Sequence, residues 1–438
     1  MKYFSTNKNS PLVSFKEATI KGQAPDKGLY FPETIPTVQE DLIHGIEKLS
    51  NEEIAWRVMK PFTGDEIPDD KLFQIVSETI NFPIPLVKVN DSISSLELFH
   101  GPTLAFKDVG ARFMSRCLGH FLKNEDRKVT VLVATSGDTG GAVANGFYDV
   151  KGVEVIILYP SRKVSPVQEK QLATLGKNIH ALEIEGTFDD CQQMVKEAFM
   201  DAEIKEKLFL TSANSINIAR WLPQQFYYFL AYKQWADKGN PPVISVPSGN
   251  FGNICAGLLA KHSGLPVQHF VAACNANDMV PNFLQTIPNM SLWGNFKTRR
   301  AVSTLSNAMD VGDPSNFVRI LEIFNHEFND LKKGLSSFSI TDVETVATIK
   351  EVFEQHNYIL DPHGAVGYLA LQKYLAEHNN TKGIFLETAH PVKFPAAVVS
   401  VTGKVIEVPE SIAAIMDQET KSTMMQADFS FLKEYLLK

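Results

Sequence analysis

Short apolar runs rich in β-branched residues alternate with stretches of helical periodicity, and this alternation limits the fold more than any other feature of the sequence. The runs are VTVLVA at 129–134, VEVIILY at 153–159, IHALEIE at 179–185, VISVP at 243–247, VQHFVAAC at 267–274 and GIFLET at 383–388. Nearly continuous apolar strands separated by helices are typical of parallel sheets that helices cover on both faces. The sequence therefore predicts an α/β fold.

The stretches between these runs predict helices at 139–149, 164–176, 188–206, 216–238, 252–263, 314–333, 341–356 and 364–377. Before about residue 95 the sequence is mixed helix and turn, with Pro and Gly scattered through it. A chain of 438 residues is long enough for two or three lobes. We expect a small N-terminal region at 1–95 and two lobes, at 96–240 and 241–438, each with a parallel sheet.

The composition excludes several classes of protein. Lys and Arg number 42 against 50 Asp and Glu, a net charge of −8, so the chain has no basic footprint for nucleic acid. Hydrophobic residues at 44% and charged residues at 21% exclude wholesale disorder. The start MKYFSTNKNS lacks the apolar segment of a signal peptide, and no apolar run approaches the roughly 18 residues of a membrane span. We expect a cytoplasmic protein without a nucleic-acid or membrane partner.

The four cysteines lie far apart, at 117, 191, 255 and 274, and form no C-x-x-C pair. This spacing suggests neither a zinc site nor a disulfide framework. We therefore expect reduced thiols and no metal.

The turn at 248–253 follows the apolar run VISVP and has the sequence SGNFGN. Two glycines that turn the backbone at positive φ, small polar side chains and a helix that begins near Gly252 would bring backbone N–H groups to one point. Such a turn suits a phosphate, although a tight turn with a capping Asn would also explain these residues. Neither G-x-x-x-x-G-K-[ST] nor G-x-G-x-x-G is present in this turn, which disfavours a nucleoside triphosphate or a dinucleotide.

Two more polar turns follow strand-like runs. In TSGDTGG at 135–141, hydroxyl and N–H groups could bind a carboxylate or phosphate, but a role of Asp138 or Thr139 as helix N-cap would alone explain these residues. In SANSINIAR at 212–220, Ser, Asn and Arg could bind an anion, or the turn could be an ordinary capped helix with a solvated Arg220. We expect Arg220 to lie more than one turn inside that helix.

Lys107 stands in HGPTLAFKD, at the expected start of an amphipathic helix. Apolar neighbours and the positive end of a helix disfavour an ammonium ion, so this lysine could form a Schiff base, although a surface position is commoner for a single Lys. Thr388 ends the run GIFLET, where its hydroxyl could bond a ring nitrogen or be structural.

Taken together, HGPTLAFKD, ATSGDTGGA, SANSINIAR, PSGNFGN and ETAHPVKF resemble the motifs of the threonine synthase family. This family uses pyridoxal 5'-phosphate and has PLP fold type II, the fold of the tryptophan synthase β-like superfamily. The resemblance extends to GLYFPE near the start, GDEIP at 64–68 and TLSNAMDVGDPSNF at 304–317, and so covers nearly the whole chain.

The resemblance implies a role for each turn. Lys107 holds the cofactor as a Schiff base and moves protons, and Thr388 faces the pyridine nitrogen. The cofactor phosphate binds to Ser248, Gly249, Asn250, Phe251, Gly252 and Asn253. Asp138 is also placed among the cofactor-binding residues, although some relatives carry Asn there. Ser136, Gly137 and Thr139 contact the substrate, and Asn214, Ser215 and Arg220 bind the substrate's own phosphate.

The implied reaction converts O-phospho-L-homoserine and water to L-threonine and phosphate, the last step of threonine biosynthesis, without a metal. A monomer or a homodimer is expected. Three alternatives remain open from the sequence: a related phospho-lyase that eliminates phosphate without adding water, a serine/threonine dehydratase, and a non-catalytic protein that keeps the fold. The leading region and HGPTLAFKD match the synthases better than the dehydratases, and the intact Lys107 argues against a non-catalytic protein.

Overall fold

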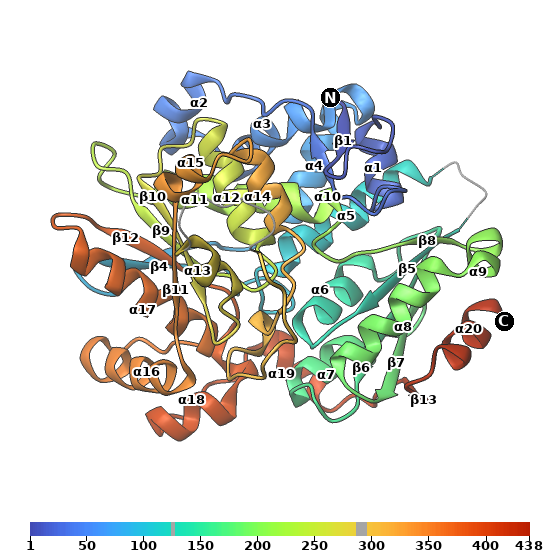
Figure 1. The fold of residues 1–438 in the computed structure, drawn as a ribbon. Helices are drawn as coiled ribbons and strands as arrows, with labels where there is room; N and C mark the ends of the chain where they lie inside the picture. The colour runs from blue at the N-terminus through green and yellow to red at the C-terminus, as the bar shows by residue number, and fades with distance from the viewer. Residues whose placement is uncertain (124–127, 286–295) are drawn as a thin grey trace.

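The computed structural model describes residues 1–123, 128–285 and 296–438. Strands in these ranges form three sheets, and the two larger sheets lie side by side beneath a layer of N-terminal helices (Figure 1). This arrangement confirms the predicted α/β fold with parallel sheets covered by helices.

The six-stranded sheet has the order β11-β10-β9-β12-β4-β3, and it is parallel except for β3, which pairs antiparallel with β4. Its strands are β3 (Leu86–Lys88), β4 (Ile93–Glu97), β9 (Val243–Pro247), β10 (His269–Cys274), β11 (Leu335–Ser339) and β12 (Gly383–Glu387). Every residue of β9, β10 and β12 is buried, as expected for central strands covered on both faces.

The five-stranded sheet has the order β13-β7-β6-β5-β8 and is entirely parallel. Its strands are β5 (Val129–Ala134), β6 (Val153–Pro160), β7 (Ile179–Glu185), β8 (Phe209–Thr211) and β13 (Ser422–Gln426). All six strand-like runs of the sequence are strands in the structure, with ends that differ by at most two residues.

The N-terminal region contains a two-stranded antiparallel sheet of β1 (Tyr3–Ser5) and β2 (Tyr30–Pro32) and a group of helices. These helices are α1 (Phe15–Lys21), α2 (Glu40–Gly45), η1 (Ile46–Lys48), α3 (Asn51–Thr63), η2 (Gly64–Glu66) and α4 (Asp69–Thr79). The region shares the main hydrophobic core, where Phe15 of α1 packs edge-on against Phe121 with ring centroids 6.2 Å apart. It therefore packs directly onto the helix that begins at Lys107.

The remaining α-helices of the described ranges pack on the two large sheets or on one another. They are α5 (Lys107–Phe121), α6 (Asp138–Phe147), α7 (Pro166–Ala173), α8 (Phe188–Met200), α9 (Ala202–Lys207), α10 (Ile218–Trp221), α11 (Gln225–Gln234), α12 (Gly252–His262), α13 (Met279–Leu284), α14 (Phe317–Ile323), α15 (Phe328–Gly334), α16 (Asp342–His356), α17 (Pro362–Glu377), α18 (Pro395–Thr402), α19 (Glu410–Met416) and α20 (Phe429–Leu437). Three 3₁₀ turns, η3 (Leu222–Gln224), η4 (Asn307–Met309) and η5 (Pro391–Lys393), connect them.

Three predicted helices are each two helices in the structure. The stretch 188–206 breaks at Asp201, which has extended φ and ψ angles and caps α9. The stretch 216–238 breaks at η3, where Pro223 has no N–H to donate. The stretch 314–333 breaks after α14, where Asn325 and His326 have φ of 50° and 62°. Local backbone geometry therefore overrides the apolar periodicity at each break.

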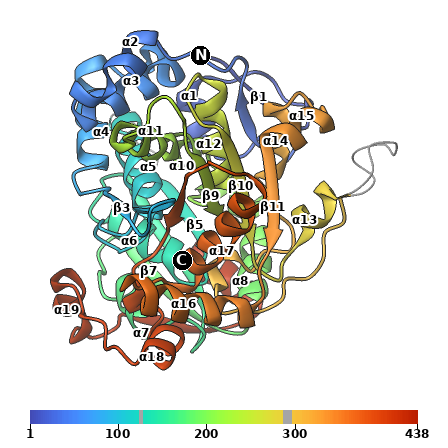
Figure 2. The same ribbon diagram turned by 90° about the vertical axis from the view of Figure 1, so that its left-hand side faces the viewer.

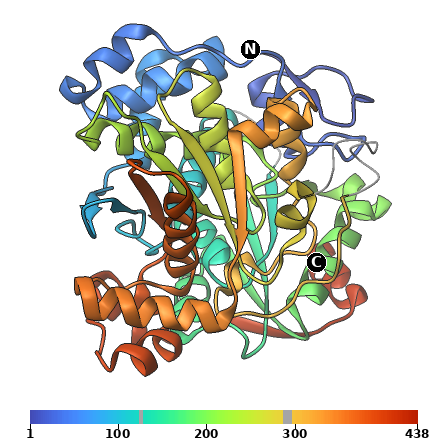
Figure 3. The same ribbon diagram turned by 60° about the vertical axis from the view of Figure 1, so that its left-hand side comes forward.

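The C-terminal segment crosses from one large sheet to the other. Helices α18 and α19 lie at the end of the molecule opposite the N-terminal helices (Figure 2). Strand β13 then pairs in parallel with β7, and α20 packs on α8 beside the five-stranded sheet (Figure 3). No helix in the described ranges is long and apolar enough to span a membrane.

Candidate active site

Lys107 is the first residue of α5, and its side chain is only 16% exposed. Burial lowers the pKa of this lysine, and the positive charges of Lys393 and Arg220 lower it further, while the carboxylate of Asp138 opposes them. Its amine is therefore easier to deprotonate than that of a surface lysine. The predicted position of Lys107 at a helix start is confirmed.

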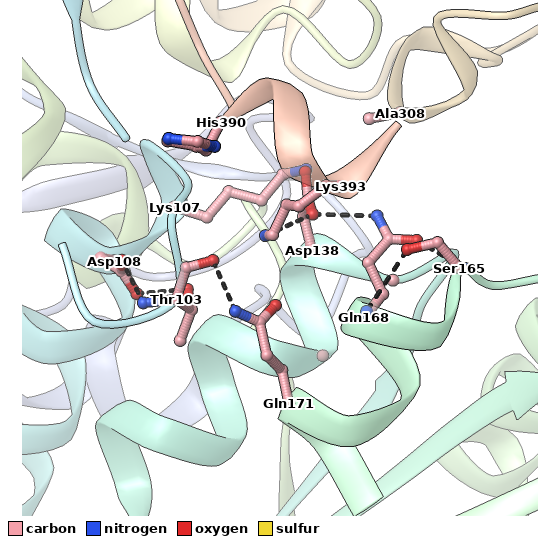
Figure 4. Close-up of polar contacts among 12 residues, drawn as sticks. Thr103, Lys107, Asp108, Asp138, Ser165, Gln168, Gln171, Ala308, His390 and Lys393 are labelled. Atoms are coloured by element: carbon pink, nitrogen blue, oxygen red, sulfur yellow. Dashed lines mark hydrogen bonds and ion pairs between the residues drawn. The ribbon is translucent and has the colours of Figure 1, made fainter. Parts of the chain in front are cut away.

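Asp138 and Lys393 form a buried ion pair beside Lys107 (Figure 4). The Nζ atom of Lys393 lies 2.8 Å from Oδ1 of Asp138, and the Nζ atom of Lys107 lies 3.7 Å from Oδ2. Gln168 donates from Nε2 to the same Oδ1 at 3.0 Å. Burial opposes the ionisation of Asp138, but the charges of Lys393 and Lys107 outweigh it and hold the pKa of Asp138 below its usual range.

The turn before α6 is held by Thr135 rather than by a capping side chain at the helix start. The Oγ1 atom of Thr135 accepts from the N–H groups of Gly137 at 3.0 Å and Gly140 at 2.8 Å. The N-cap is Gly137, which has a φ of 134° and lies against Gln168, so that no side chain fits there. The alternative of Asp138 or Thr139 as N-cap is therefore wrong.

The turn before Lys107 is fixed by a buried carboxylate. Asp108 accepts from the backbone N of Thr103 at 2.9 Å and from its Oγ1 at 2.5 Å. The N–H of Phe106 donates to the carbonyl of Thr388 at 3.0 Å. This bond places the end of β12, with the Thr388 hydroxyl, next to the residue that precedes Lys107.

The turn at 248–253 presents backbone N–H groups, as predicted. The N–H groups of residues 249–253 have no hydrogen-bond partner within the described part of the chain. Helix α12 begins at Gly252, and its N-terminal dipole points into the same turn. Five free N–H groups at a helix start form a cradle for an anion such as a phosphate.

Glycine occupies two positions of this cradle for a reason other than the predicted positive φ. The residue with positive φ is Phe251, at 62°, and neither glycine has one. A Cβ atom on Gly249 would lie 2.5 Å from the Cα atom of Met309, and one on Gly252 would lie 3.2 Å from Cβ of Ser215. Close packing, not backbone conformation, therefore requires glycine at 249 and favours it at 252.

Two predicted sites meet at Ser215. Its Oγ atom accepts from Nδ2 of Asn250 at 2.8 Å and from Nδ2 of Asn316 at 3.0 Å. Asn250 belongs to the cradle and Ser215 to the turn of SANSINIAR. The two turns are therefore in direct contact.

Arg220 is the third residue of α10, so the prediction that it lies more than one turn inside the helix is wrong. Arg220 is 3% exposed, and its Nη1 atom donates to the carbonyl of Ala213. Burial lowers its pKa to about 10. Within the described residues, Nε of Arg220 and Oδ1 of Asn214 are buried without a partner. A buried cation with a free donor can bind an anionic ligand.

Arg319 of α14 holds the turn at 212–220 by hydrogen bonds to its backbone. This residue was not among those predicted from the sequence. It is fully buried and donates to the carbonyls of Ser215 at 3.1 Å and Ile216 at 2.6 Å, and to Oδ1 of Asn316 at 2.7 Å. Its Nε also donates to the carbonyl of Tyr30 in the N-terminal region, at 3.1 Å. The only sequence feature that could have pointed to Arg319 was its position just after TLSNAMDVGDPSNF.

Lys393 and Gln168 were also missed. Lys393 lies in ETAHPVKF, directly after a strand that ends at the site, and this position was the available signal. Among the predicted residues, Lys107 and Asp138 lie together, as do Asn250 and Ser215. Ser136, in the β5–α6 turn, and Thr139, the second residue of α6, are both partly exposed.

The sequence matches three family descriptions. Residues 85–386 match "Pyridoxal-phosphate dependent enzyme", residues 2–80 match "Threonine synthase N terminus", and residues 364–436 match "Threonine synthase, C-terminal". Together these matches cover nearly the whole chain.

Threonine synthases from several organisms are similar to this chain over their full length. The enzyme of Serratia marcescens is 44% identical over 438 residues, which is 100% of this chain and 99% of the relative. The crystal structure of threonine synthase from Escherichia coli superposes with a TM-score of 0.91 at 43% identity, covering 100% of this chain and 99% of that one. A structure of threonine synthase from Brucella melitensis, described as PLP bound, has a TM-score of 0.91 at 35% identity, covering 100% of this chain and 98% of that one.

Proposed function

We propose how individual residues act in this chain, starting from the finding that it belongs to the threonine synthase family of pyridoxal-phosphate-dependent enzymes. The reaction is the conversion of O-phospho-L-homoserine and water to L-threonine and phosphate, and the cofactor is pyridoxal 5'-phosphate. The single observation that supports the residue assignments best is that a nearly buried lysine of lowered pKa and a cradle of five free N–H groups lie beyond the same ends of two paired parallel strands. The cradle follows β9, and Phe106, next to Lys107, bonds Thr388 just after β12.

The residues present fit the cofactor. We propose that Lys107 binds it covalently and that the turn at 248–253 binds its phosphate. The cradle offers donors without a positive side chain, which suits a permanently charged phosphate. Thr388 would face the ring nitrogen with a neutral hydroxyl. When bound, pyridoxal phosphate supplies an electron sink that stabilises negative charge on the substrate carbons.

The substrate phosphate needs a second anion site. We propose that Asn214, Ser215 and Arg220 form it, with the free Nε of Arg220 as the charged donor. The contact between Ser215 and Asn250 supports this proposal, because it sets the two anion sites side by side. Ser136, Gly137 and Thr139 would bind the substrate carboxylate with the hydroxyl and N–H groups of their turn.

Lys107 is the proposed proton carrier. Burial and the nearby cations lower the pKa of its amine, which can take a proton from Cα of the substrate and return one later in the reaction. Asp138, being ionised, accepts hydrogen bonds and has no proton to donate to the cofactor. We propose that Asp138 instead acts on the site through the two lysines that it contacts.

The wider assignments remain proposals as well. We propose an N-terminal region at 1–95 and lobes at 96–240 and 241–438, with β13 returning from the last lobe to the sheet of the second. We propose a cytoplasmic monomer or homodimer that acts on a small molecule and has no nucleic-acid partner. The net charge of −8 supports the last point, and the four cysteines, all free and buried, agree with a reducing compartment.

The test is a product assay. Purified protein is mixed with pyridoxal phosphate and O-phospho-L-homoserine, and phosphate and amino acids are measured in the same samples. Equal amounts of phosphate and threonine support a synthase. Phosphate with a 2-oxo acid instead of threonine would indicate the related phospho-lyase, and the absence of both products would overturn the proposed reaction.

A further inference from the structure

Lys393 is a buried cation to which the implied chemistry assigns no task. Its side chain is 0% exposed, and within the described residues its Nζ atom has one hydrogen-bond partner, Oδ1 of Asp138. A fully buried lysine is rare unless its charge is paired. The pairing with Asp138 therefore accounts for the burial of Lys393. The pair also lies beside Lys107, where it can act on the Lys107 amine.

The carboxylate of Asp138 lies between two lysines at unequal distances. Lys393 is in hydrogen-bond contact at 2.8 Å, whereas Lys107, at 3.7 Å, is beyond an ordinary hydrogen bond. Gln168 also donates to Oδ1, from the side opposite Lys393, so two donors fix this oxygen (Figure 4). The positive charge of Lys393 therefore offsets part of the effect of the Asp138 carboxylate, which raises the pKa of Lys107 while Lys393 lowers it.

The backbone around Lys393 fixes this position. Lys393 ends η5, and its N–H donates to the carbonyl of His390 at 3.0 Å. The N–H of His390 donates in turn to the carbonyl of Leu104, at 3.1 Å, in the turn that leads to Lys107. The ammonium group therefore approaches Asp138 from a turn tied to Lys107, not from a free surface chain.

We propose that Lys393 is a positioning residue that binds the Asp138 carboxylate and so leaves the Lys107 amine free to react. This inference rests on the proposed role of Lys107. Without Lys393, Asp138 would pair with Lys107 and stabilise its ammonium form. With Lys393 in place, Asp138 orients Lys107 without keeping it protonated.

The charged groups that face Lys107 come from several elements. Asp138 lies on α6, Lys393 on η5 and Arg220 on α10. Asp108 is the next residue on α5, and its carboxylate is bound to Thr103. Asp138 raises the pKa of Lys107, whereas Lys393 and Arg220 lower it. Removal of Lys393 and removal of Asp138 should therefore move this pKa in opposite directions, and this opposition makes the proposal testable.

The experiment measures the reactivity of Lys107 in the full chain before cofactor is added. Trace labelling with acetic anhydride, followed by quantitative peptide mass spectrometry, gives the pH midpoint of the Lys107 amine. Lys393→Met is expected to raise the midpoint by about one pH unit, a tenfold loss of labelling at a fixed pH below it. Asp138→Asn is expected to lower the midpoint, and the double variant is expected to lie well below Lys393→Met.

Two matched variants complete the design. Lys393→Arg keeps the charge and should restore a midpoint within about 0.3 units of the wild type, a twofold change in labelling. Lys433→Met removes a lysine that is 2.9 Å from Asp201 on the surface, and it should leave Lys107 unchanged. The rate at which each variant captures added pyridoxal phosphate provides a second readout and should follow the same order.

An unchanged midpoint in Lys393→Met, or a raised one in Asp138→Asn, would overturn the proposal. If Lys393→Met does not fold, Asp138→Asn and Lys393→Arg still decide the matter, since each has its own predicted midpoint. Labelling requires no turnover, so this result stands apart from the product assay. A chain that makes no threonine could still show the predicted order of midpoints.

Discussion

The two halves of the site handle negative charge in different ways. At 248–253 the groups available to an anion are five backbone N–H groups at a helix start. Around Lys107 the charged groups are side chains instead. One carboxylate, that of Asp138, lies between two lysines, and a third cation, Arg220, is nearby. Backbone N–H groups do not titrate, whereas the lysines and the aspartate of the second set can gain or lose a proton.

This difference corresponds to what each half must do. A cofactor phosphate stays charged and stays in place, so fixed dipoles are sufficient to hold it. A proton carrier must change its charge during the reaction, so its pKa has to be set by neighbours. Each prediction below alters one half of the site, or the contact between the halves, and asks whether the other half is affected.

The largest effect is expected from Lys107→Ala, which removes the side chain that both binds the cofactor and carries protons. Turnover should fall by at least about 10³-fold, the range typical of lost acid–base catalysis. The absorbance of covalently bound cofactor should also disappear. Phosphate release and the visible spectrum measure the two effects, and activity near that of the wild type would refute the assignment of Lys107.

Arg220→Ala should weaken the binding of the substrate phosphate while leaving the cofactor in place. A charge-assisted hydrogen bond contributes about 1.5–3 kcal/mol, so KM for O-phospho-L-homoserine should rise about 10-fold to 100-fold. Arg220→Lys, which keeps a charge, should lose less. If KM stays constant and cofactor occupancy falls instead, the two phosphate sites have been exchanged in our assignment.

Arg319→Met tests the support of the turn that contains Ser215, which contacts the 248–253 half through Asn250. The substitution removes the Arg319 donor from the carbonyls of Ser215, Ile216 and Tyr30, and a buried carbonyl left unpaired costs about 1–3 kcal/mol. The free energy of unfolding in urea should fall by about 3 kcal/mol or more, because several of these groups lose their partner at once.

The matched control is Arg57→Met. Arg57 forms surface ion pairs with Asp41 and Glu53, so its loss should cost less than about 1 kcal/mol. Equal losses in the two variants would show that burial of Arg319 does not matter.

Much of the fold could be predicted because the buried central strands are marked by apolar residues within their own segments. The run 129–134 is a strand with the same bounds in the structure, and all six of its residues are buried. Strand β13 could not be predicted, because Ser422–Gln426 is a partly exposed edge strand whose place depends on pairing with β7, far away in the sequence. The broken helices show the same limit, since single residues such as Pro223 outweigh periodicity.

Only those parts of the site that are marked by neighbouring residues in the sequence could be predicted. Lys107 and the turn at 248–253 carry signals in their own neighbours, a helix start in one case and glycines after a strand in the other. Lys393 and Arg319 act through contacts with segments far away in the sequence, Asp138 for the first and Ser215 for the second. Such contacts become visible only when the chain is folded.

The most direct test of the division between the halves is the affinity of the protein for pyridoxine phosphate, which carries the cofactor's phosphate but no aldehyde. Its dissociation constant can be measured by calorimetry for the wild type, Gly249→Val and Lys107→Ala. A side chain at Gly249 would collide with Met309, so Gly249→Val should weaken binding at least about tenfold, or about 1.4 kcal/mol. Lys107→Ala should stay close to the wild type. A large loss in Lys107→Ala with none in Gly249→Val would contradict the account.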